Sequence, residues 1–318
     1  MPDKLLDQIR TKLGHASLQY TPSLYLDTGI PDLNRVLGHA DKGIPYGTII
    51  EISGLESVGK SAISLALAAL AQQDKALALW GDFERSWASD WSRIRGLARC
   101  PACADQVNEK CPACGGKDAL LYRLDGSRLK VLQPYVGTFG SDKKTRLSTA
   151  EEITAEMEAV MTALHRKYDR MVTVVDSLAS MLTQSEAEAG LEGANLRTAQ
   201  SHPVFLGHLL RRWVGLSQGY NALIILINQL RQNPMAHFAD PWYSPGGNAI
   251  RFYPHVRVRV RRSKGSRILE QGRQIGTQGI MRCTKNKVGG QEGAEIGYKL
   301  LFRGSLEFFP IKPSEESE

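Results

Sequence analysis

Residues 54–61 read GLESVGKS and lie between an apolar segment and a helix-forming segment, which is the setting of a phosphate-binding P-loop. Gly54 and Gly59 would let the backbone approach phosphate oxygens, to which amides at the helix N-terminus donate. Lys60 would reach the outer phosphates, and the hydroxyl of Ser61 would ligate Mg²⁺. The loop positions predicted to bind ATP are Gly54, Glu56, Ser57, Gly59, Lys60 and Ser61. The pattern therefore predicts a site for ATP and Mg²⁺.

Two acidic residues follow apolar strands and could complete that site. The stretch MVTVVDS contains Asp176, which is suited to hold Mg²⁺ through the water shell of the ion. Glu84 follows another strand in WGDFERSW and could orient or deprotonate the water that attacks the γ-phosphate. Each residue also has an ordinary explanation, since many α/β strands end in aspartate and an isolated glutamate is more often a surface residue. The upstream P-loop is what favours Asp176 as a functional acid.

Four of the five cysteines lie in one window of the sequence, CPACADQVNEKCPACGG. The two Cys-x-x-Cys pairs, Cys100 with Cys103 and Cys111 with Cys114, have the spacing of a tetrahedral zinc site. Four protein ligands leave no open position, so the predicted Zn²⁺ is structural, and an iron centre is the main alternative. The fifth cysteine, Cys283, lies in a strand-like segment and is expected to be a buried apolar thiol.

Apolar segments alternate with helix-forming segments, which predicts an α/β fold with a mostly parallel, twisted sheet covered by helices on both faces. The expected parallel strands are residues 48–52, 77–80, 171–175 and 223–227. The expected helices are residues 61–73, residues 148–167 with a capping box of Ser148 and Glu151, and residues 203–218. Residues 255–262 alternate valine with arginine, and residues 279–284 and 296–302 are further strand candidates. These last three segments predict antiparallel strands at one edge of the sheet.

The charge balance permits a polyanionic partner. The 318 residues have a formal net charge of +7, and between Arg251 and Lys287 there are eleven basic residues and one acidic residue, Glu270. A solvated basic face is the ordinary alternative to a nucleic-acid surface. The sequence begins without a leader-like apolar run and contains no run of about 18 apolar residues, so we expect a cytoplasmic protein without a membrane partner.

Four segments in order resemble the core of RecA-type DNA recombinases: TGIPDLNRVLG leading to IIEISGLESVGKS, then GDFE, then VVDS, and finally LIILINQLRQNPMAHFADPWYSPGGNAIRFY. The resemblance covers roughly residues 25–309, apart from the cysteine-rich insertion. It implies a RecA-type P-loop ATPase that forms a helical homo-oligomer on single-stranded DNA, pairs it with double-stranded DNA, and binds ATP between neighbouring subunits. It thus implies a DNA-dependent ATPase that catalyses homologous pairing and strand exchange.

The resemblance also implies roles for individual residues around ATP. Glu84 would be the catalytic glutamate and Gln229 the sensor of the γ-phosphate. Lys285 and Lys287, in TKNKVGG, would reach across the subunit interface to the phosphates of the neighbouring subunit, although a basic edge strand is the alternative. Trp91 stands where the family places an aromatic ring against adenine, but a tryptophan on a helix is otherwise usually part of a core.

Two DNA-binding loops are implied. Residues 230–244 would be the second DNA-binding loop, with PGGNA at residues 245–249 as its far anchor, and its aromatic content agrees with contacts to bases. Residues 184–194 would contain the first loop, but this segment is acidic and a plain surface loop is the alternative. The residues expected to contact DNA are Arg197, Arg231, Phe238, Trp242, Gly246, Gly247, Asn248, Arg251 and Arg261. Phe252 and Arg257 match positions at the polymer interface.

The expected organisation has four parts. Residues 1–24 would form a helix and strand arm for polymerisation, residues 25–309 the ATPase core, residues 99–118 the zinc-binding insertion, and residues 310–318 a short acidic tail. Because little sequence follows the core, the chain is similar to compact, phage-type members of the family, which would place it in the cytoplasm of a bacterial host. A single-strand-binding protein or a loader could be a further partner.

Two other functions also fit the sequence. A branch-migration helicase of the RadA/Sms group also combines a four-cysteine zinc site with this core, although there the zinc site precedes the core and a protease-like domain follows it. A non-catalytic loader of true recombinases is the third possibility. The presence of Glu84 and Gln229 in a complete nucleotide site argues against the loader.

Overall fold

A computed structural model describes residues 21–87, 125–139, 144–189, 196–232, 241–302 and 306–311. Its centre is a nine-stranded sheet in the order β15-β14-β13-β12-β3-β9-β8-β4-β5. The strands from β5 to β12 pair in parallel, and β13, β14 and β15 add antiparallel neighbours beyond β12. The strands are β3 (Ile49–Gly54), β4 (Leu77–Asp82), β5 (Leu129–Leu132), β8 (Met171–Asp176), β9 (Ala222–Gln229), β12 (Val256–Glu270), β13 (Arg273–Asn286), β14 (Glu295–Leu301) and β15 (Leu306–Phe309).

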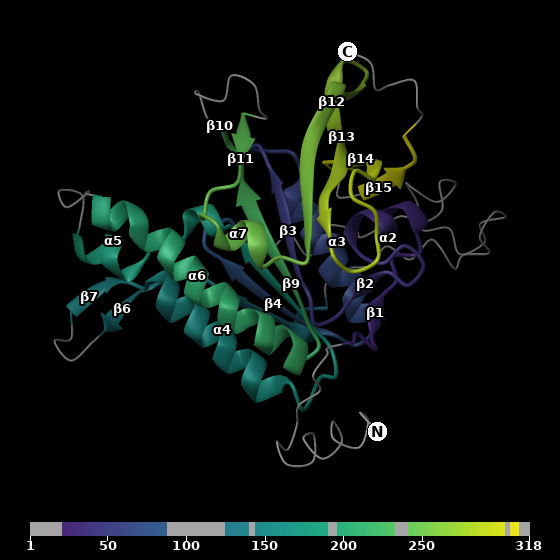
Figure 1. The fold of residues 1–318 in the computed structure, drawn as a ribbon. Coiled ribbons are helices and arrows are strands. Elements are labelled where there is room, and N and C mark those ends of the chain that lie inside the picture. The colour runs from purple at the N-terminus through teal and green to yellow at the C-terminus, as the bar shows by residue number, and fades with distance from the viewer. Residues whose placement is uncertain are drawn as a thin grey trace, which may run out of the picture.

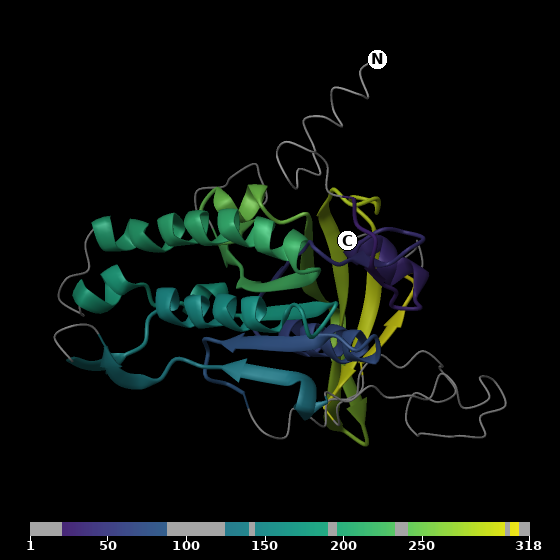
Figure 2. The ribbon, with the colours of Figure 1, turned by 90° about the horizontal axis from the view of Figure 1, so that it is seen from below.

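Helices cover both faces of the sheet. One buried cluster joins α3 and α2 to one face, and a second joins α4 and α6 to the other face. The central strands supply both clusters because successive side chains alternate: Ile50 and Ile52 belong to the first and Ile49 to the second. Figures 1 and 2 show α4 and α6 side by side. The helices are α2 (Pro31–Leu37), α3 (Lys60–Gln73), α4 (Ala150–Leu164), α5 (Gln184–Ala189), α6 (Leu196–Gly219) and α7 (Ala249–Phe252), with short 3-10 turns η3 (Gly126–Arg128) and η4 (Leu178–Ser180).

Among the described residues, three two-stranded ribbons lie outside the main sheet. They are β1 (Tyr25–Leu26) with β2 (Ile44–Pro45), β6 (Val136–Phe139) with β7 (Lys144–Leu147), and β10 (Arg231–Gln232) with β11 (Trp242–Tyr243). The β6–β7 ribbon lies with α5 at the end of the molecule opposite β13 to β15 (Figures 1 and 2). The β10–β11 ribbon closes the base of the predicted second DNA-binding loop, because Arg231 pairs with Tyr243 and Gln232 with Trp242.

The predicted α/β fold with a mostly parallel sheet is confirmed, and so are the antiparallel strands at one edge. The segment that alternates valine with arginine differs from the prediction, because β12 pairs parallel to β3 on one side and antiparallel to β13 on the other. Val256, Val258 and Val260 are fully buried against the core, so this strand belongs to the interior of the sheet. No helix among the described residues is long and apolar enough to cross a membrane.

Two helix starts differ from the prediction. The capping box of α4 is formed by Thr149 and Glu152, one residue later than predicted, because Glu152 is held by Arg146 at 2.7 Å and accepts from the Thr149 amide at 2.8 Å. Ser148 instead accepts a hydrogen bond from the Tyr135 amide. The helix predicted to start at Pro203 begins earlier, at Leu196, and contains this proline.

The proposed division into an arm, a core, an insertion and a tail stays a prediction. The predicted N-terminal helix, the four cysteines predicted to bind zinc, Trp91 and Phe238 lie outside the described residues. Within the described residues no group of three or more potential metal ligands is found. Cys283 lies within them and is fully buried, as expected.

Candidate active site

The P-loop is the turn that connects β3 to α3. Gly54 is the last residue of β3, and a β-carbon at this position would lie 2.5 Å from the Val260 carbonyl oxygen, so only glycine fits. Gly59, immediately before α3, has a φ of 88°, in the left-handed region that glycine adopts without strain. The sequence therefore places its two glycines where the chain approaches a neighbouring strand and where it turns into the helix.

Lys60 lies inside the curve of this loop. Its ammonium donates to the Gly54 carbonyl at 3.1 Å and to the Leu55 carbonyl at 2.7 Å, and the side chain is buried. Burial lowers the pKa of Lys60, whereas the acids Asp176, Glu84 and Glu56 oppose that shift. The loop thus holds a buried cation close to the turn, where it could balance the charge of phosphates.

Asp176 ends β8 beside the P-loop. Burial raises the pKa of Asp176 to about 6, while a hydrogen bond from Ser61 and the charge of Lys60 act in the opposite direction. Its Oδ2 atom is buried and has no hydrogen-bond partner among the described residues. A buried carboxylate oxygen without a donor, next to a serine hydroxyl, fits a hard divalent cation such as Mg²⁺. Ser61 and Asp176 are therefore the residues that would hold the ion.

Glu84 and Gln229 meet at the carboxyl ends of two parallel strands, β4 and β9, that lie on either side of β8. The Glu84 carboxylate accepts from the Ser177 hydroxyl at 2.6 Å, and the Gln229 side-chain amide lies 3.4 Å from the same oxygen. Glu84 follows β4, Ser177 follows β8, and Gln229 is the last residue of β9. The strand order brings these residues together from positions up to 145 residues apart in the sequence.

These residues share one cleft of about 690 Å³. Its lining includes most of the predicted nucleotide site, namely Glu56, Ser57, Gly59, Lys60, Ser61, Glu84, Asp176 and Gln229. On its other side it is lined by residues that sequence reasoning missed, namely Arg262, Gln274, Thr277, Leu300 and Phe302. Arg262 donates to the Ser57 carbonyl at 3.3 Å, and Phe302 is 63% exposed. The exposed ring of Phe302 offers an apolar surface for a nucleotide base.

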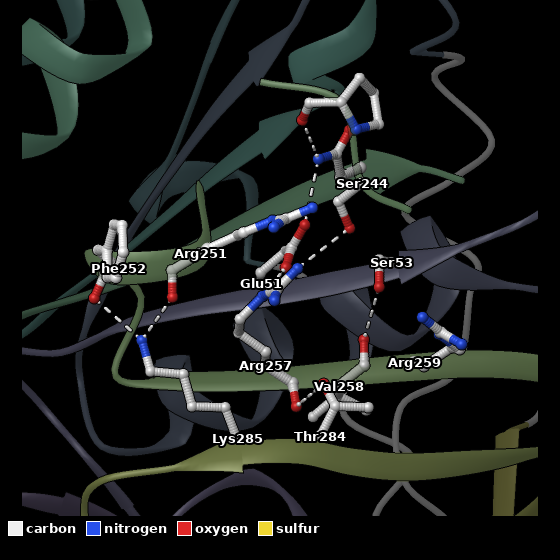
Figure 3. A network of polar contacts seen from close by, with 12 residues as sticks. Glu51, Ser53, Ser244, Arg251, Phe252, Arg257, Val258, Arg259, Thr284 and Lys285 are labelled. Atoms are coloured by element: carbon white, nitrogen blue, oxygen red, sulfur yellow. Dashed lines mark hydrogen bonds and ion pairs between the residues drawn. The ribbon is translucent and has the colours of Figure 1, made fainter. Parts of the chain in front are cut away.

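The two predicted trans-acting lysines lie elsewhere. Lys285 donates to the carbonyl oxygens of Arg251 and Phe252 at 2.8 and 2.9 Å, at the C-terminal end of α7 (Figure 3). Burial and the charge of Lys287 lower the pKa of Lys285 to about 8. Neither lysine is among the described residues that line the cleft of its own chain.

The predicted second DNA-binding loop leaves the sheet directly after Gln229. At its far end, a β-carbon on Gly246 would meet the Leu206 side chain at 2.8 Å and one on Gly247 would meet Pro203 at 3.1 Å, and both glycines have positive φ. Asn248 is the N-cap of α7. The PGGN segment is therefore seated closely on α6, which suits an anchor.

The other residues predicted to contact DNA lie around this loop. Arg231, Arg251 and Arg261 are exposed, and Trp242 is half-buried. In the first predicted loop, residues 184–189 are helical, because Thr183 and Glu186 cap α5, while residues 190–194 lie outside the described residues. Arg197 lies in the first turn of α6, and the placement of its side chain lies outside what the structure describes.

A parallel sheet with a P-loop at a strand end, a buried lysine, and two carboxylates beside them, Asp176 and Glu84, is the architecture of a nucleotide-binding protein of the P-loop class. The family profile of the RecA N-terminal domain matches residues 135–300. Because this match covers more than half of the chain, the protein belongs to the RecA family.

Curated relatives agree with this assignment. The chain is 30% identical over 278 residues to a protein named Protein RecA from Clostridium botulinum (strain Eklund 17B / Type B), a match that covers 87% of this chain and 63% of the relative. It is 30% identical over 264 residues to Protein RecA of Geobacter sulfurreducens, covering 83% of this chain and 63% of the relative. It is 29% identical over 290 residues to Protein RecA of Clostridium perfringens (strain 13 / Type A), covering 89% and 68%. The chain thus spans just under two thirds of the first two relatives.

Proposed function

We propose that this chain is a DNA-dependent ATPase that assembles as a helical filament on single-stranded DNA and exchanges homologous strands. The contact between Glu84 and Gln229 is the observation that supports this most directly. One partner faces the expected position of the γ-phosphate, and the other is the residue from which the second DNA-binding loop departs. A group that touches both the hydrolytic glutamate and the base of a DNA-binding loop can link the two activities.

Each side chain of the cleft would have a separate role in hydrolysis. Lys60 balances the outer phosphates, and Mg²⁺ held by Ser61 and Asp176 would supply charge stabilisation at the phosphate oxygens. Glu84 would accept a proton from, or orient, the attacking water, and the Ser177 hydroxyl fixes the glutamate by its bond of 2.6 Å. Phe302 would stack on the base of the nucleotide. All of these residues belong to the cleft of a single chain.

The neighbouring subunit would complete the site. Lys285 is near the end of β13 and Lys287 directly follows that strand, and both lie away from the cleft of their own chain, so they could reach a second chain. The ammonium of Lys285 is held by two carbonyl oxygens without a carboxylate partner among the described residues. A positively charged group with this environment would gain from a phosphate delivered by a neighbour.

DNA would be held mainly through its backbone. Arg231, Arg251 and Arg261 are exposed around the second loop. Their guanidinium groups would bind phosphates, and such contacts carry no sequence information. Trp242 could stack on an unpaired base. Sequence specificity would then come from base pairing between the two DNA molecules.

Electron microscopy and ATPase assays test this proposal together. With single-stranded DNA and a non-hydrolysable ATP analogue we expect continuous helical filaments, and with ATP we expect hydrolysis that rises when DNA is added. Strand exchange between a labelled single strand and homologous duplex completes the test. Closed hexameric rings that translocate on DNA would favour a branch-migration motor instead, and an absence of DNA-stimulated hydrolysis would refute the proposal.

A further inference from the structure

A buried carboxylate, Glu51, lies at the base of the predicted second DNA-binding loop. Glu51 is on β3, three residues before the first glycine of the P-loop, and its side chain is fully buried. One carboxylate oxygen accepts from the side-chain amide of Asn228 at 3.1 Å, and the other accepts from the guanidinium of Arg257 at 2.5 Å. Figure 3 shows Arg257 reaching Glu51 from the neighbouring strand β12. A buried carboxylate requires hydrogen-bond donors, so Glu51 holds the side chains of Asn228 and Arg257 in place.

Both partners of Glu51 continue to the end of the loop where the chain returns to the sheet. The Asn228 amide also donates to the Pro245 carbonyl at 3.0 Å, and Arg257 donates to the Ser244 hydroxyl at 3.3 Å. Ser244 and Pro245 are called the return stem here. A single carboxylate is thus linked through two different side chains to the return stem.

Asn228 also fixes the end of the loop where the chain leaves the sheet. Its side-chain oxygen accepts from the Gln229 amide at 3.0 Å, and the Leu230 amide donates to the Gly54 carbonyl of the P-loop at 3.3 Å. The side chain of Gln229 in turn lies 3.4 Å from Glu84. The contacts form one continuous path from the hydrolytic glutamate, through Asn228 and Glu51, to the return stem.

We propose that Glu51 is a positioning residue that fixes both stems of the second DNA-binding loop and thereby allows the loop to respond to the nucleotide. This inference rests on the proposed function and names the residue through which the nucleotide and DNA sites are coupled. Glu51 is not among the described residues that line the nucleotide cleft. It acts by holding Asn228 behind Gln229 and Arg257 against the return stem.

A purely stabilising role makes a different prediction. Buried ion pairs often stabilise a fold little better than well-packed apolar residues, so stability alone gives no reason for a charge here. If Glu51 only filled the core, its replacement would lower the stability of the protein. The ratio of its affinity for DNA in the ATP state to that in the ADP state would stay unchanged. If Glu51 positions the loop, that ratio falls.

The variant Glu51→Gln separates these possibilities. Its amide oxygen can still accept from Asn228, but its amide nitrogen would face the guanidinium of Arg257, which loses its carboxylate acceptor and keeps only the contact with the Ser244 hydroxyl. The matched control is Ser53→Ala, on the same strand, which removes a buried hydrogen bond of 3.2 Å to the Val258 carbonyl without touching Glu51. Titration of labelled single-stranded DNA, with an ATP analogue and with ADP, measures the ratio of the two affinities.

We expect wild type and Ser53→Ala to bind DNA more tightly with the ATP analogue, by roughly 5-fold to 150-fold as is typical of coupled sites. In Glu51→Gln the ratio should fall to near one, while binding of a fluorescent ATP analogue confirms that the P-loop is intact. The milder variant Ser244→Ala, which removes only the contact from Arg257, should reduce the ratio by about fivefold, the equivalent of one ordinary hydrogen bond. A folded Glu51→Gln that keeps the wild-type ratio overturns the inference.

Amide hydrogen exchange gives a result that does not depend on the proposed function. Exchange at Gln229 and Leu230 should be faster in Glu51→Gln than in Ser53→Ala, because Asn228 loses its fixed position. If wild type itself shows no nucleotide-dependent DNA binding, the proposed function fails. The positioning role is then judged by exchange alone, and equal exchange rates at Gln229 and Leu230 in the two variants would overturn it. If Glu51→Gln does not fold, Ser244→Ala decides by the same ratio, and an unchanged ratio overturns the inference.

Discussion

Asp176→Asn should make the nucleotide-free protein more stable at pH 8 while removing its response to Mg²⁺ and ATP. Burial raises the pKa of Asp176 from 3.8 to about 6, so the folded state resists ionisation of this carboxyl. The shift is about two units, and each unit corresponds to about 1.4 kcal/mol. When Asp176 is ionised in both the folded and the unfolded state, its burial therefore lowers the free energy of unfolding by at most about 3 kcal/mol.

The sign of the pH dependence follows from proton uptake. Between pH 3.8 and pH 6 the folded protein holds a proton on Asp176 that the unfolded chain has lost, so the free energy of unfolding falls as the pH rises through this window. Above pH 6 the full penalty is present, and below about pH 4 it is absent. The amide introduced by Asp176→Asn carries no charge at any pH, so the advantage of the variant should be largest at pH 8 and vanish near pH 4.

Urea unfolding at a series of pH values measures this directly. Wild type and Asp176→Asn are compared without added Mg²⁺ or nucleotide, where the other titrating groups are common to both proteins and cancel in the difference. Addition of Mg²⁺ and ATP at pH 8 should stabilise wild type and have little effect on the variant, because the cation ligand is gone. A stability difference that does not change between pH 8 and pH 4 would refute the reasoning.

Further variants test the remaining roles. Lys60→Ala should lose tight ATP binding, whereas Glu84→Gln should bind ATP and lose turnover, measured by nucleotide titration and phosphate release. Gln229→Ala should bind ATP but lose stimulation of hydrolysis by DNA. Neutralising Arg251 or Arg261 should reduce the slope of log affinity against log salt by about one unit for each lost phosphate contact, without changing base preference. Metal analysis of the purified protein should find one zinc per chain, which chelation removes together with the fold of the four-cysteine insertion.

The position of the P-loop could be predicted from local sequence. The P-loop is one continuous segment, and its glycines, lysine and serine take the places that the spacing requires. Asp176 could also be placed, because it ends an apolar run and parallel strands bring their carboxyl ends to one edge, whereas Gln229 is assigned through the family resemblance. The meeting of Gln229 with Glu84 required the order of the strands, for which the family resemblance was the only guide.

The far side of the cleft could not be predicted because it depends on a long-range pairing. Val260 pairs with Gly54 across more than 200 residues, and this register brings Arg262 and the strands beyond it over the P-loop. Alternation of valine and arginine indicates a strand but says nothing of its neighbour or direction. Phe302 was missed for the same reason, since its exposure has meaning only beside the P-loop.

The start of α4 shows a limit of a different kind. Ser148 with Glu151 and Thr149 with Glu152 have the same capping-box spacing, so the local pattern permits either start. The second start is favoured because Arg146 binds Glu152 at 2.7 Å and because the Ser148 hydroxyl already accepts a hydrogen bond from the Tyr135 amide. Both deciding contacts come from the β6–β7 ribbon and the segment before it, and their geometry is not contained in the helix sequence.

The register of the central strands explains why a nucleotide site and a DNA-binding loop would share one edge of the sheet. Gly54 pairs with Gln229 across β3 and β9, so the last residue before the loop lies beside the first glycine of the P-loop. A shift of one residue in β9 would turn the Gln229 side chain to the opposite face, away from Glu84. Glu51, three residues before Gly54, pairs in the same register with Leu226 and reaches Asn228 along the strand. We therefore expect any change that moves Gln229 relative to the P-loop also to move Asn228 against a buried charge, so that the base of the loop responds as a unit.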